Sequence, residues 1–365
     1  MSLRFKLLLL LLLTTALACG FMHHIVPPQV LNFERLHIFL FNLCVGGTLL
    51  IYFTEGQKRL STHGKLYCLG SLLFALTAFL EWYPPTLFLP LGLAVITERV
   101  RVLHLGHCIP VEMLRSSEPV AKKFHQAALL CLSLALIISS LVILNAIYLH
   151  YFTIPKLTLD TFFLGFSFPL SLISMSVIFS LMQKARTSFA RTLKEISFWI
   201  INLGVIIFFI FILAGLFIPQ VIIASTLFIT VGLVFFLYIS LGIPSQQKNF
   251  LLSGILFLLC TSITGIIYIL LEFSPLYNPE NSLPLLRMHA FMALYGWNLS
   301  GLAVAARHRE FPLQLQTKPT IALHWITVVI LCPLGYFFAP VAIVAVLAYS
   351  VFLYQLLFGI GEEIS

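Results

Sequence analysis

The chain alternates between long apolar runs and short polar or charged breaks. A run of about 18 apolar residues with few charges is typical of a membrane-spanning helix, because hydrocarbon offers the backbone no hydrogen-bond partners. The pattern predicts twelve spans, of which the fourth is short and begins at Pro84-Pro85. The predicted spans are 5–22, 36–53, 66–83, 85–98, 126–149, 160–183, 195–217, 219–241, 250–272, 285–305, 319–337 and 339–360.

Composition agrees with this pattern. Hydrophobic residues make up 60% of the chain, charged residues make up 9%, and the mean hydropathy is +1.04. These values exclude an ordinary soluble domain and predict one all-α, polytopic transmembrane domain over residues 1–365. The first run follows Arg4 and Lys6 and ends in small residues, as a secretory signal does. We interpret residues 1–22 as an uncleaved signal-anchor, with a cleaved signal peptide as the alternative.

The net charge of +8 is distributed very unevenly between the two sides of the predicted topology. With a cytoplasmic N-terminus, 18 of the 21 Lys and Arg residues fall inside, and only Arg35, Lys156 and Arg287 fall outside. This is the positive-inside bias of membrane proteins. We therefore expect a lipid-embedded protein of the bacterial cytoplasmic membrane with both termini in the cytoplasm. The positive charge reflects topology and does not indicate nucleic-acid binding.

Two outer arginines each precede a histidine by two positions, at the start of a span. Arg35 precedes His37, and Arg287 precedes His289. Both spans run from outside to inside, so the two imidazoles enter the membrane at similar depth. Haem iron takes one or two neutral imidazoles, and its anionic propionates need cationic partners when buried. The pattern predicts one haem b, with His37 and His289 on the iron and the arginines on the propionates.

The surroundings of these histidines suit a flat apolar ligand. The chain has 34 phenylalanines, and Phe291 and Trp297 follow His289 closely, as walls of a haem slot. The alternative is two independent histidines that extend with their arginines toward the outer headgroups. The seven cysteines form no C-x-x-C pair, so any haem is held non-covalently.

A weaker metal candidate lies in the inner loop after the fourth span. His104 and His107 have the i, i+3 spacing of one helical face, which could bind a transition metal. However, no acidic or histidine-rich partner stands at a recognisable distance along the chain. A solvated loop is therefore the better interpretation.

Arg35-Leu36-His37, Phe41 and Gly46-Gly47 resemble the second helix of haem–copper oxidase subunit I, especially the cbb-type oxidases and nitric oxide reductases. His289 through Gly296-Trp297 resembles the tenth helix of that family, and the span plan is also similar to the NnrS proteins. The resemblance implies that His37 is a low-spin haem ligand at the outer side. The family's second tenth-helix histidine falls on Phe291. His289 is therefore either the partner of His37 or the ligand of a five-coordinate haem.

The departures from the family limit the function that the resemblance implies. The family's copper ligands come from the sixth and seventh helices, and no histidine occurs between Tyr151 and Met288. We therefore expect no copper at the binuclear site. We expect a role in electron transfer or in a nitric-oxide or redox response, with a cytochrome or respiratory-complex subunit as candidate partner, and no terminal oxidase activity.

Two functions without a cofactor stay open. The first is a transporter, with Asp160, Asn298 and His324 as polar groups along a pathway. The second is a structural subunit of a respiratory membrane complex.

Overall fold

The computed structural model describes residues 1–154, 156–157, 159, 165–184, 187–244, 247–275, 277–310, 315 and 317–360. Asp160 lies outside the described residues. Within these ranges the chain is 81% helical and contains no strand. The expected all-α class is therefore confirmed.

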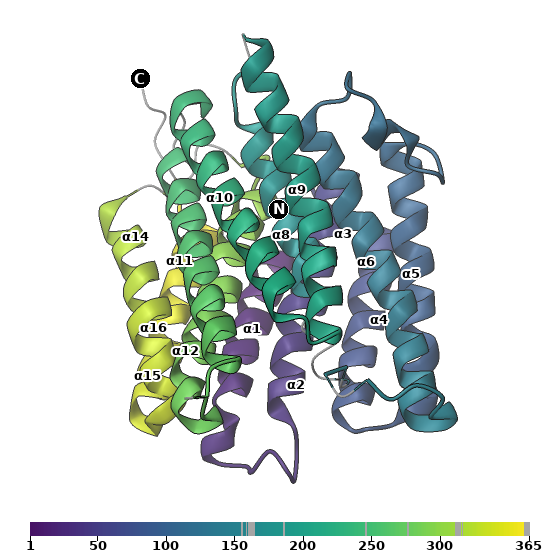
Figure 1. Ribbon diagram of the computed structural model, residues 1–365, viewed down its shortest axis with the longest axis vertical. Helices are drawn as coiled ribbons and strands as arrows, with labels where there is room; N and C mark the ends of the chain where they lie inside the picture. The colour runs from purple at the N-terminus through teal and green to yellow at the C-terminus, as the bar shows by residue number, and fades with distance from the viewer. Residues whose placement is uncertain are drawn as a thin grey trace.

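Long helices lie side by side and alternate in direction along the chain (Figure 1). In several of these helices the chain passes from α-helical to π-helical geometry without a break. In order, the main elements are α1 (Leu3–Gly20), α2 (Phe33–Ile38), η2 (Phe39–Gly47), α3 (Thr48–Glu55), α4 (Thr62–Phe79), α5 (Tyr83–Leu105), α6 (Val120–Leu144), η4 (Asn145–Leu149), α8 (Ser167–Ser180), α9 (Ser188–Leu213), α10 (Phe217–Leu241), α11 (Lys248–Glu272), α12 (Pro279–Phe291), η5 (Met292–Asn298), α13 (Leu299–Ala306), α14 (Lys318–Trp325), η6 (Ile326–Leu331), α15 (Cys332–Phe337) and α16 (Ala339–Phe358).

Eight helices within the described ranges are long and apolar enough to cross a membrane. The chain is therefore an integral membrane protein whose helices contact lipid. The predicted number of twelve spans stays a prediction. The eight helices are Leu3–Gly20, Phe33–Glu55, Val120–Leu149, Ser188–Leu213, Phe217–Leu241, Lys248–Glu272, Lys318–Phe337 and Ala339–Phe358.

Several helices extend well beyond the predicted apolar runs, and α5 and α12 show why. Helix α5 continues to Leu105 because Arg101 is neutralised there: its Nη2 lies 2.7 Å from Glu98 Oε2 and donates to the Cys108 carbonyl, also at 2.7 Å. Helix α12 begins at Pro279, where the side chain of Asn278 accepts a hydrogen bond from the Glu280 amide at 2.9 Å. Hydropathy marks the apolar part of a helix and not its capped ends.

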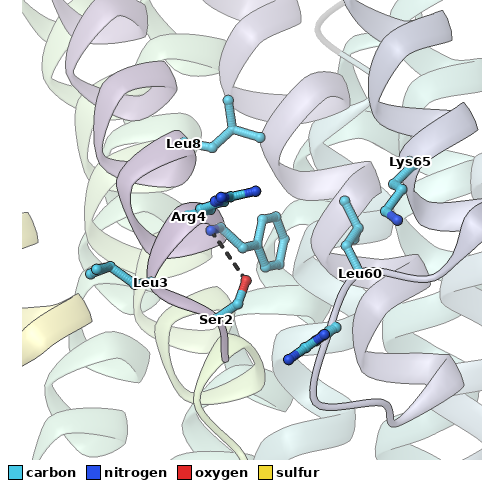
Figure 2. A pocket seen from close by; sticks show the side chains of 8 residues that line it. Ser2, Leu3, Arg4, Leu8, Leu60 and Lys65 are labelled. Atoms are coloured by element: carbon cyan, nitrogen blue, oxygen red, sulfur yellow. Dashed lines mark hydrogen bonds between the residues drawn. The ribbon is translucent and has the colours of Figure 1, made fainter.

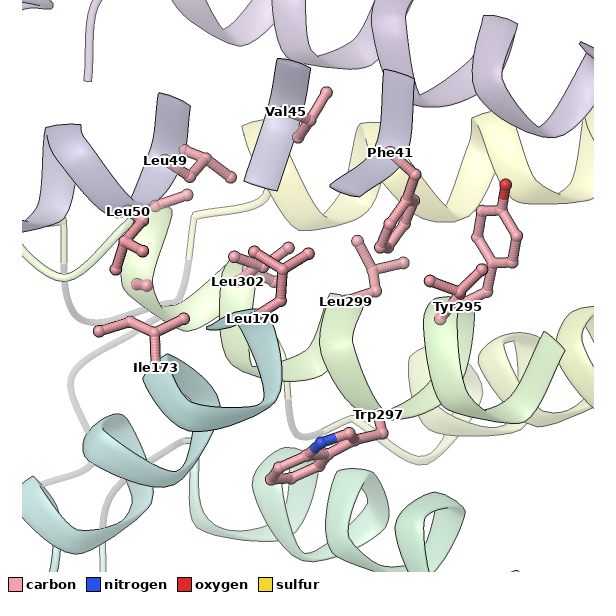
Figure 3. Close-up of a cluster of buried hydrophobic side chains, with 14 of the residues drawn as sticks. Phe41, Val45, Leu49, Leu50, Leu170, Ile173, Tyr295, Trp297, Leu299 and Leu302 are labelled. Carbon is pink, nitrogen blue, oxygen red and sulfur yellow. The ribbon is translucent and has the colours of Figure 1, made fainter. Parts of the chain in front are cut away.

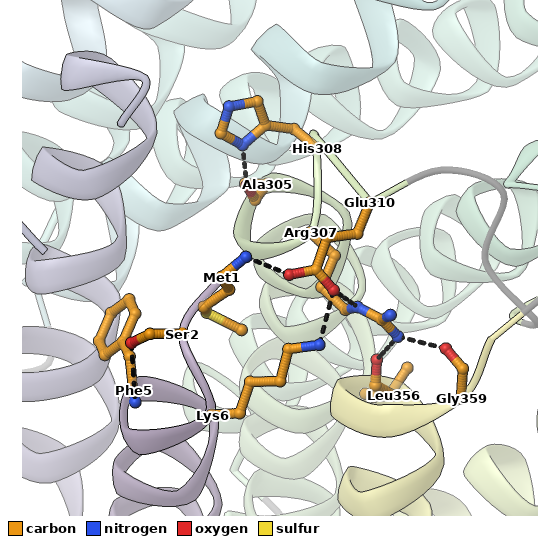
Figure 4. A network of polar contacts seen from close by, with 10 residues as sticks. All are labelled: Met1, Ser2, Phe5, Lys6, Ala305, Arg307, His308, Glu310, Leu356 and Gly359. Atoms are coloured by element: carbon orange, nitrogen blue, oxygen red, sulfur yellow. Dashed lines mark hydrogen bonds and ion pairs between the residues drawn. The ribbon is translucent and has the colours of Figure 1, made fainter. Parts of the chain in front are cut away.

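One end of the bundle carries the N-terminus, the end of α13 and the end of α16. Lys6 on α1 donates to Glu310 at 2.6 Å, and Arg307 donates to the Leu356 and Gly359 carbonyls at 2.9 and 2.6 Å (Figure 4). We call this the N-terminal end. Because consecutive helices alternate in direction, Arg35, Lys156 and Arg287 lie at the opposite end.

The core is centred where η2 and α3 meet α8, η5 and α13 (Figure 3). Phe41, Leu170 and Tyr295 are completely buried there. Helices α13 and α8 approach closely at Gly301, where an added Cβ would lie 2.0 Å from Ser174 Oγ. Small residues permit such backbone contact between membrane helices. This packing fixes the rotation of the helices that carry the candidate histidines.

Candidate cofactor site

In the part of the chain that the structure describes, three helices contain a π-helical segment that begins within three residues after a histidine. The segments η2, η5 and η6 follow His37, His289 and His324. Such wide turns cost hydrogen-bond geometry and are frequent at functional sites.

The structure brings the two Arg-x-His segments together at one end of the bundle. Arg287 on α12 forms an ion pair with Glu34 on α2, and its second contact, from Nη2 to Glu34 Oε2, is 3.2 Å long. Arg35 donates instead to the Ala78 carbonyl at 3.0 Å and to Glu81 at 3.2 Å. Both arginines therefore have protein partners, so their outer position does not require haem propionates.

His37 lies deep between α1 and η5. Its Nδ1 is 2.7 Å from the Ala16 carbonyl on α1 and 3.0 Å from the Tyr295 hydroxyl. A carbonyl oxygen only accepts, so Nδ1 carries the proton and Nε2 keeps the lone pair. The ring packs against the α1 backbone, since an added Cβ at Gly20 would lie 3.0 Å from Nδ1.

His289 faces a different neighbour, helix α11. Its Nδ1 lies 3.0 Å from the Thr261 carbonyl and 3.3 Å from Thr264 Oγ1. The same argument assigns the proton to Nδ1 and leaves Nε2 as the free nitrogen. An added Cβ at Gly265 would lie 3.1 Å from the ring's Cε1, so this glycine makes room for the imidazole.

The two imidazoles do not share one slot. Residues two positions apart on an α-helix point about 200° apart, so Phe291 lies on the opposite face of α12 from His289. Phe291 and Tyr295 occupy the face toward α1 and His37: the Phe291 ring is 6.0 Å from Phe21, and the Tyr295 ring is 5.7 Å from His37. Aromatic side chains therefore occupy the face of α12 and η5 toward His37, whereas His289 lies on the other face.

His289 instead lines an open cavity of about 530 Å³ between α9, α10, α11 and α12. Its walls are mostly apolar, with Phe208, Leu227 and Ile266 among them. At its mouth Lys156 pairs with Glu272 at 2.7 Å. The cavity follows α11 from Glu272 down to Ser262, ten residues or about 15 Å of helix. An amphiphilic ligand fits this combination of a charged mouth and apolar walls.

The other predicted metal and pocket residues lie elsewhere. Trp297 is buried in the core, and its Nε1 donates to Ser171 at 2.6 Å. His104 and His107 are exposed, with His107 3.7 Å from Glu112. No group of three or more His, Cys, Asp or Glu suited to a metal ion occurs in the described part of the chain.

The polar residues considered for a transport pathway are held by backbone contacts. His324 stacks on Phe352 at 4.3 Å, and its Nε2 lies 2.7 Å from the Tyr295 carbonyl. Asn298 donates to the Ser167 carbonyl at 3.3 Å.

Four residues that matter at the cavity were missed by the sequence interpretation: Thr261, Gly265, Lys156 and Glu272. A usable signal existed for the ion pair, because Lys156 is one of only three outer basic residues and Glu272 ends an apolar run at the same side. No comparable signal marks Thr261, which acts through its backbone carbonyl.

Comparisons with family models, with curated proteins and with solved structures found no match for this chain. The similarity to oxidase subunit I and to the NnrS proteins therefore stays a prediction from short motifs.

Proposed function

We propose that this chain is an integral membrane haem protein in which His289 is the single axial ligand of one b-type haem. The observation that carries the proposal is the position of His289 at the wall of the cavity of about 530 Å³. Its Nδ1 is held by the Thr261 carbonyl at 3.0 Å. A ligating histidine commonly donates its other ring N–H in this way, which leaves Nε2 for the metal.

The chemistry of the cavity supports the same ligand class. Small-molecule sites typically enclose about 300–1,000 Å³, with apolar walls and a few polar groups. Lys156 at the mouth is the group suited to an anionic side chain of the ligand, in exchange for its pairing with Glu272. Gln220 and Tyr268 add polar groups nearby, and the apolar walls suit the macrocycle.

A single axial imidazole favours a five-coordinate haem over the six-coordinate haem with both histidines. A five-coordinate iron has a free position for a diatomic gas. The proposed role is therefore electron transfer or a response to a gas such as nitric oxide, with a cytochrome or respiratory-complex subunit as electron partner. Oxygen reduction at a haem–copper centre is not proposed, because the sequence supplies no copper-ligand histidines between Tyr151 and Met288.

The proposed orientation follows from charge. Most Lys and Arg residues belong to the N-terminal end of the bundle. By the positive-inside rule this end faces the cytoplasm of a bacterial cell, and the cavity lies in the outer half of the cytoplasmic membrane.

The test is an optical spectrum of the detergent-purified protein, oxidised and dithionite-reduced, with pyridine haemochrome quantitation. We expect about one haem per chain, loss of haem in His289→Ala, and carbon monoxide binding by the reduced wild type. His37→Ala is the matched control, since it also removes a buried imidazole that donates to a backbone carbonyl.

Equal loss of haem in both variants, with folding preserved, would support the six-coordinate arrangement and overturn this one. A colourless protein after haem-replete expression would overturn haem binding altogether. The transporter is then the better candidate, and one observation favours it: within the described residues, Asn298 Oδ1 and His324 Nδ1 are buried without a hydrogen-bond partner.

A further inference from the structure

A second large cavity lies at the N-terminal end of the bundle, far along the chain from His289. It has a volume of about 670 Å³ and is bounded by the start of α1 and by the α3–α4 connection with the start of α4 (Figure 2). Three cationic side chains line it: Arg4, Arg59 and Lys65. All three are exposed.

These three cations have no acidic partner among the residues that the structure describes. Each described glutamate at this end of the bundle is already engaged by another side chain. The pairs are Glu55–His63, Glu98–Arg101, Glu112–His107, Glu118–Lys122, Glu195–Lys123 and Glu310–Lys6. The cavity therefore presents positive charge that no described carboxylate neutralises.

Apart from Ser2, the remaining lining is apolar and includes Leu3, Leu8 and Leu60. Two stripes of exposed leucines lead away from the cavity along the helices. On α1 the stripe continues through Leu7 and Leu11, which are 50% and 63% exposed, and on α4 it runs through Leu66, Leu69 and Leu73. Both stripes lie on segments that are apolar over most of their length. Hydrocarbon chains beside such stripes would bury leucine surface.

We propose that this cavity binds an anionic phospholipid, with its phosphate between Arg4, Arg59 and Lys65 and its acyl chains along the leucine stripes. The cations alone would also suit a free phosphate ion, since both ligands present the same anionic oxygens. The apolar lining and its continuation along α1 and α4 assign the site to the lipid. Basic pockets between membrane helices on the cytoplasmic side bind such headgroups in the same manner.

The test is native mass spectrometry of the full chain released from detergent micelles after incubation with phosphatidylglycerol or phosphatidylcholine. We expect preferential retention of phosphatidylglycerol by the wild type. The triple variant Arg4→Gln/Arg59→Gln/Lys65→Gln should retain at least about tenfold less, because each cation near a lipid headgroup contributes substantially to binding. The single variants Arg4→Gln and Arg59→Gln should each show a smaller loss, and they keep the test valid if the triple variant folds poorly.

The charge-matched control is Arg99→Gln/Arg115→Gln/Arg191→Gln, which removes three exposed cations from the same end of the bundle but outside the cavity. We expect wild-type retention of phosphatidylglycerol in this control. Equal loss of phosphatidylglycerol retention in both triple variants would show that the positive charge of this whole end attracts the lipid. That result would overturn a specific site in the cavity. A second measurement compares thermal stabilisation by inorganic phosphate and by phosphatidylglycerol. Equal stabilisation by the two would show that the cavity binds a free anion and would overturn the assignment to a lipid.

Discussion

At Gly265 the absence of a side chain determines where the His289 ring can lie. A Cβ added at Gly265 would lie 3.1 Å from Cε1 of the His289 ring, which is closer than ordinary van der Waals contact. The adjacent ring atom, Nδ1, is fixed by its hydrogen bond to the Thr261 carbonyl. One turn of α11 therefore sets both the position and the tautomer of the imidazole.

We predict that Gly265→Ala displaces the His289 ring and lowers haem content by severalfold, with a shift of the Soret band in the haem that stays bound. The added methyl group must move the ring by a few tenths of an ångström, and a metal ligand tolerates little displacement. The measurement is haem per chain from the pyridine haemochrome, together with the reduced spectrum.

The control for this variant is Gly232→Ala on α10, where an added Cβ would meet nothing within 4 Å. Alanine at an unhindered helix position is expected to stabilise the helix by about 0.5–1 kcal/mol. Haem content should be unchanged in this control. If haem content were unchanged in Gly265→Ala as well, His289 would not be a ligand of the haem iron.

At the scale of one element, α12 presents two chemically different faces. His289 points to α11 and the cavity, whereas Arg287 and Phe291, one turn apart, point to α2, α1 and α15. Arg287 pairs with Glu34 and lies 4.3 Å from the centre of the Tyr336 ring. The guanidinium thus ties three helices together on the face away from the cavity.

We predict that Arg287→Gln leaves haem content unchanged, because the guanidinium lies on the face away from the cavity, while it lowers thermal stability. The ion pair with Glu34 is partly exposed, so its coupling energy in a double-mutant cycle with Glu34→Gln is expected to be about 0.2–1 kcal/mol. The measurement is haem per chain beside the melting temperatures of the two single variants and the double variant. Loss of haem in Arg287→Gln alone would contradict this prediction and would indicate that Arg287 binds a haem propionate.

The helices themselves could be predicted from hydropathy, but the face that each histidine presents could not. The predicted run 219–241 differs from α10 (Phe217–Leu241) by only two residues at its start. By contrast, His37 and His289 share the same Arg-x-His motif and depth, yet they contact α1 and α11 respectively. Helix rotation is set by close packing at distant positions such as Gly301 against Ser174, and a single sequence does not reveal those partners.

At the scale of the whole molecule, the N-terminal end is held by a charge network around Glu310. Its carboxylate accepts from Lys6 and from the Met1 ammonium, and it pairs with Arg307 at 3.0 Å (Figure 4). Arg307 in turn donates to the Leu356 carbonyl at 2.9 Å, at the end of α16. The network therefore connects α1, α13 and α16, which are far apart in the sequence.

This network predicts a specific dependence of stability on pH. Burial alone would raise the pKa of Glu310, but the hydrogen bonds and charges of its cationic neighbours lower it to about 2. A carboxyl group whose pKa is lower in the folded than in the unfolded state stabilises the fold above its ordinary pKa of about 4.3. That contribution is lost as the pH falls from about 4.3 toward 2. We therefore expect Glu310→Gln to melt a few degrees below wild type at neutral pH.

The difference between wild type and Glu310→Gln should narrow as the pH falls through that window, because protonation removes the same charge that the substitution removes. The measurement is the melting temperature of both proteins in a non-ionic detergent at several pH values between 7 and 3. Glu118→Gln is the control, since Glu118 pairs with the exposed Lys122 within one turn of chain at 3.2 Å, and such surface pairs contribute little. A constant difference across the whole range would show that Glu310 stabilises the bundle through packing and not through its charge.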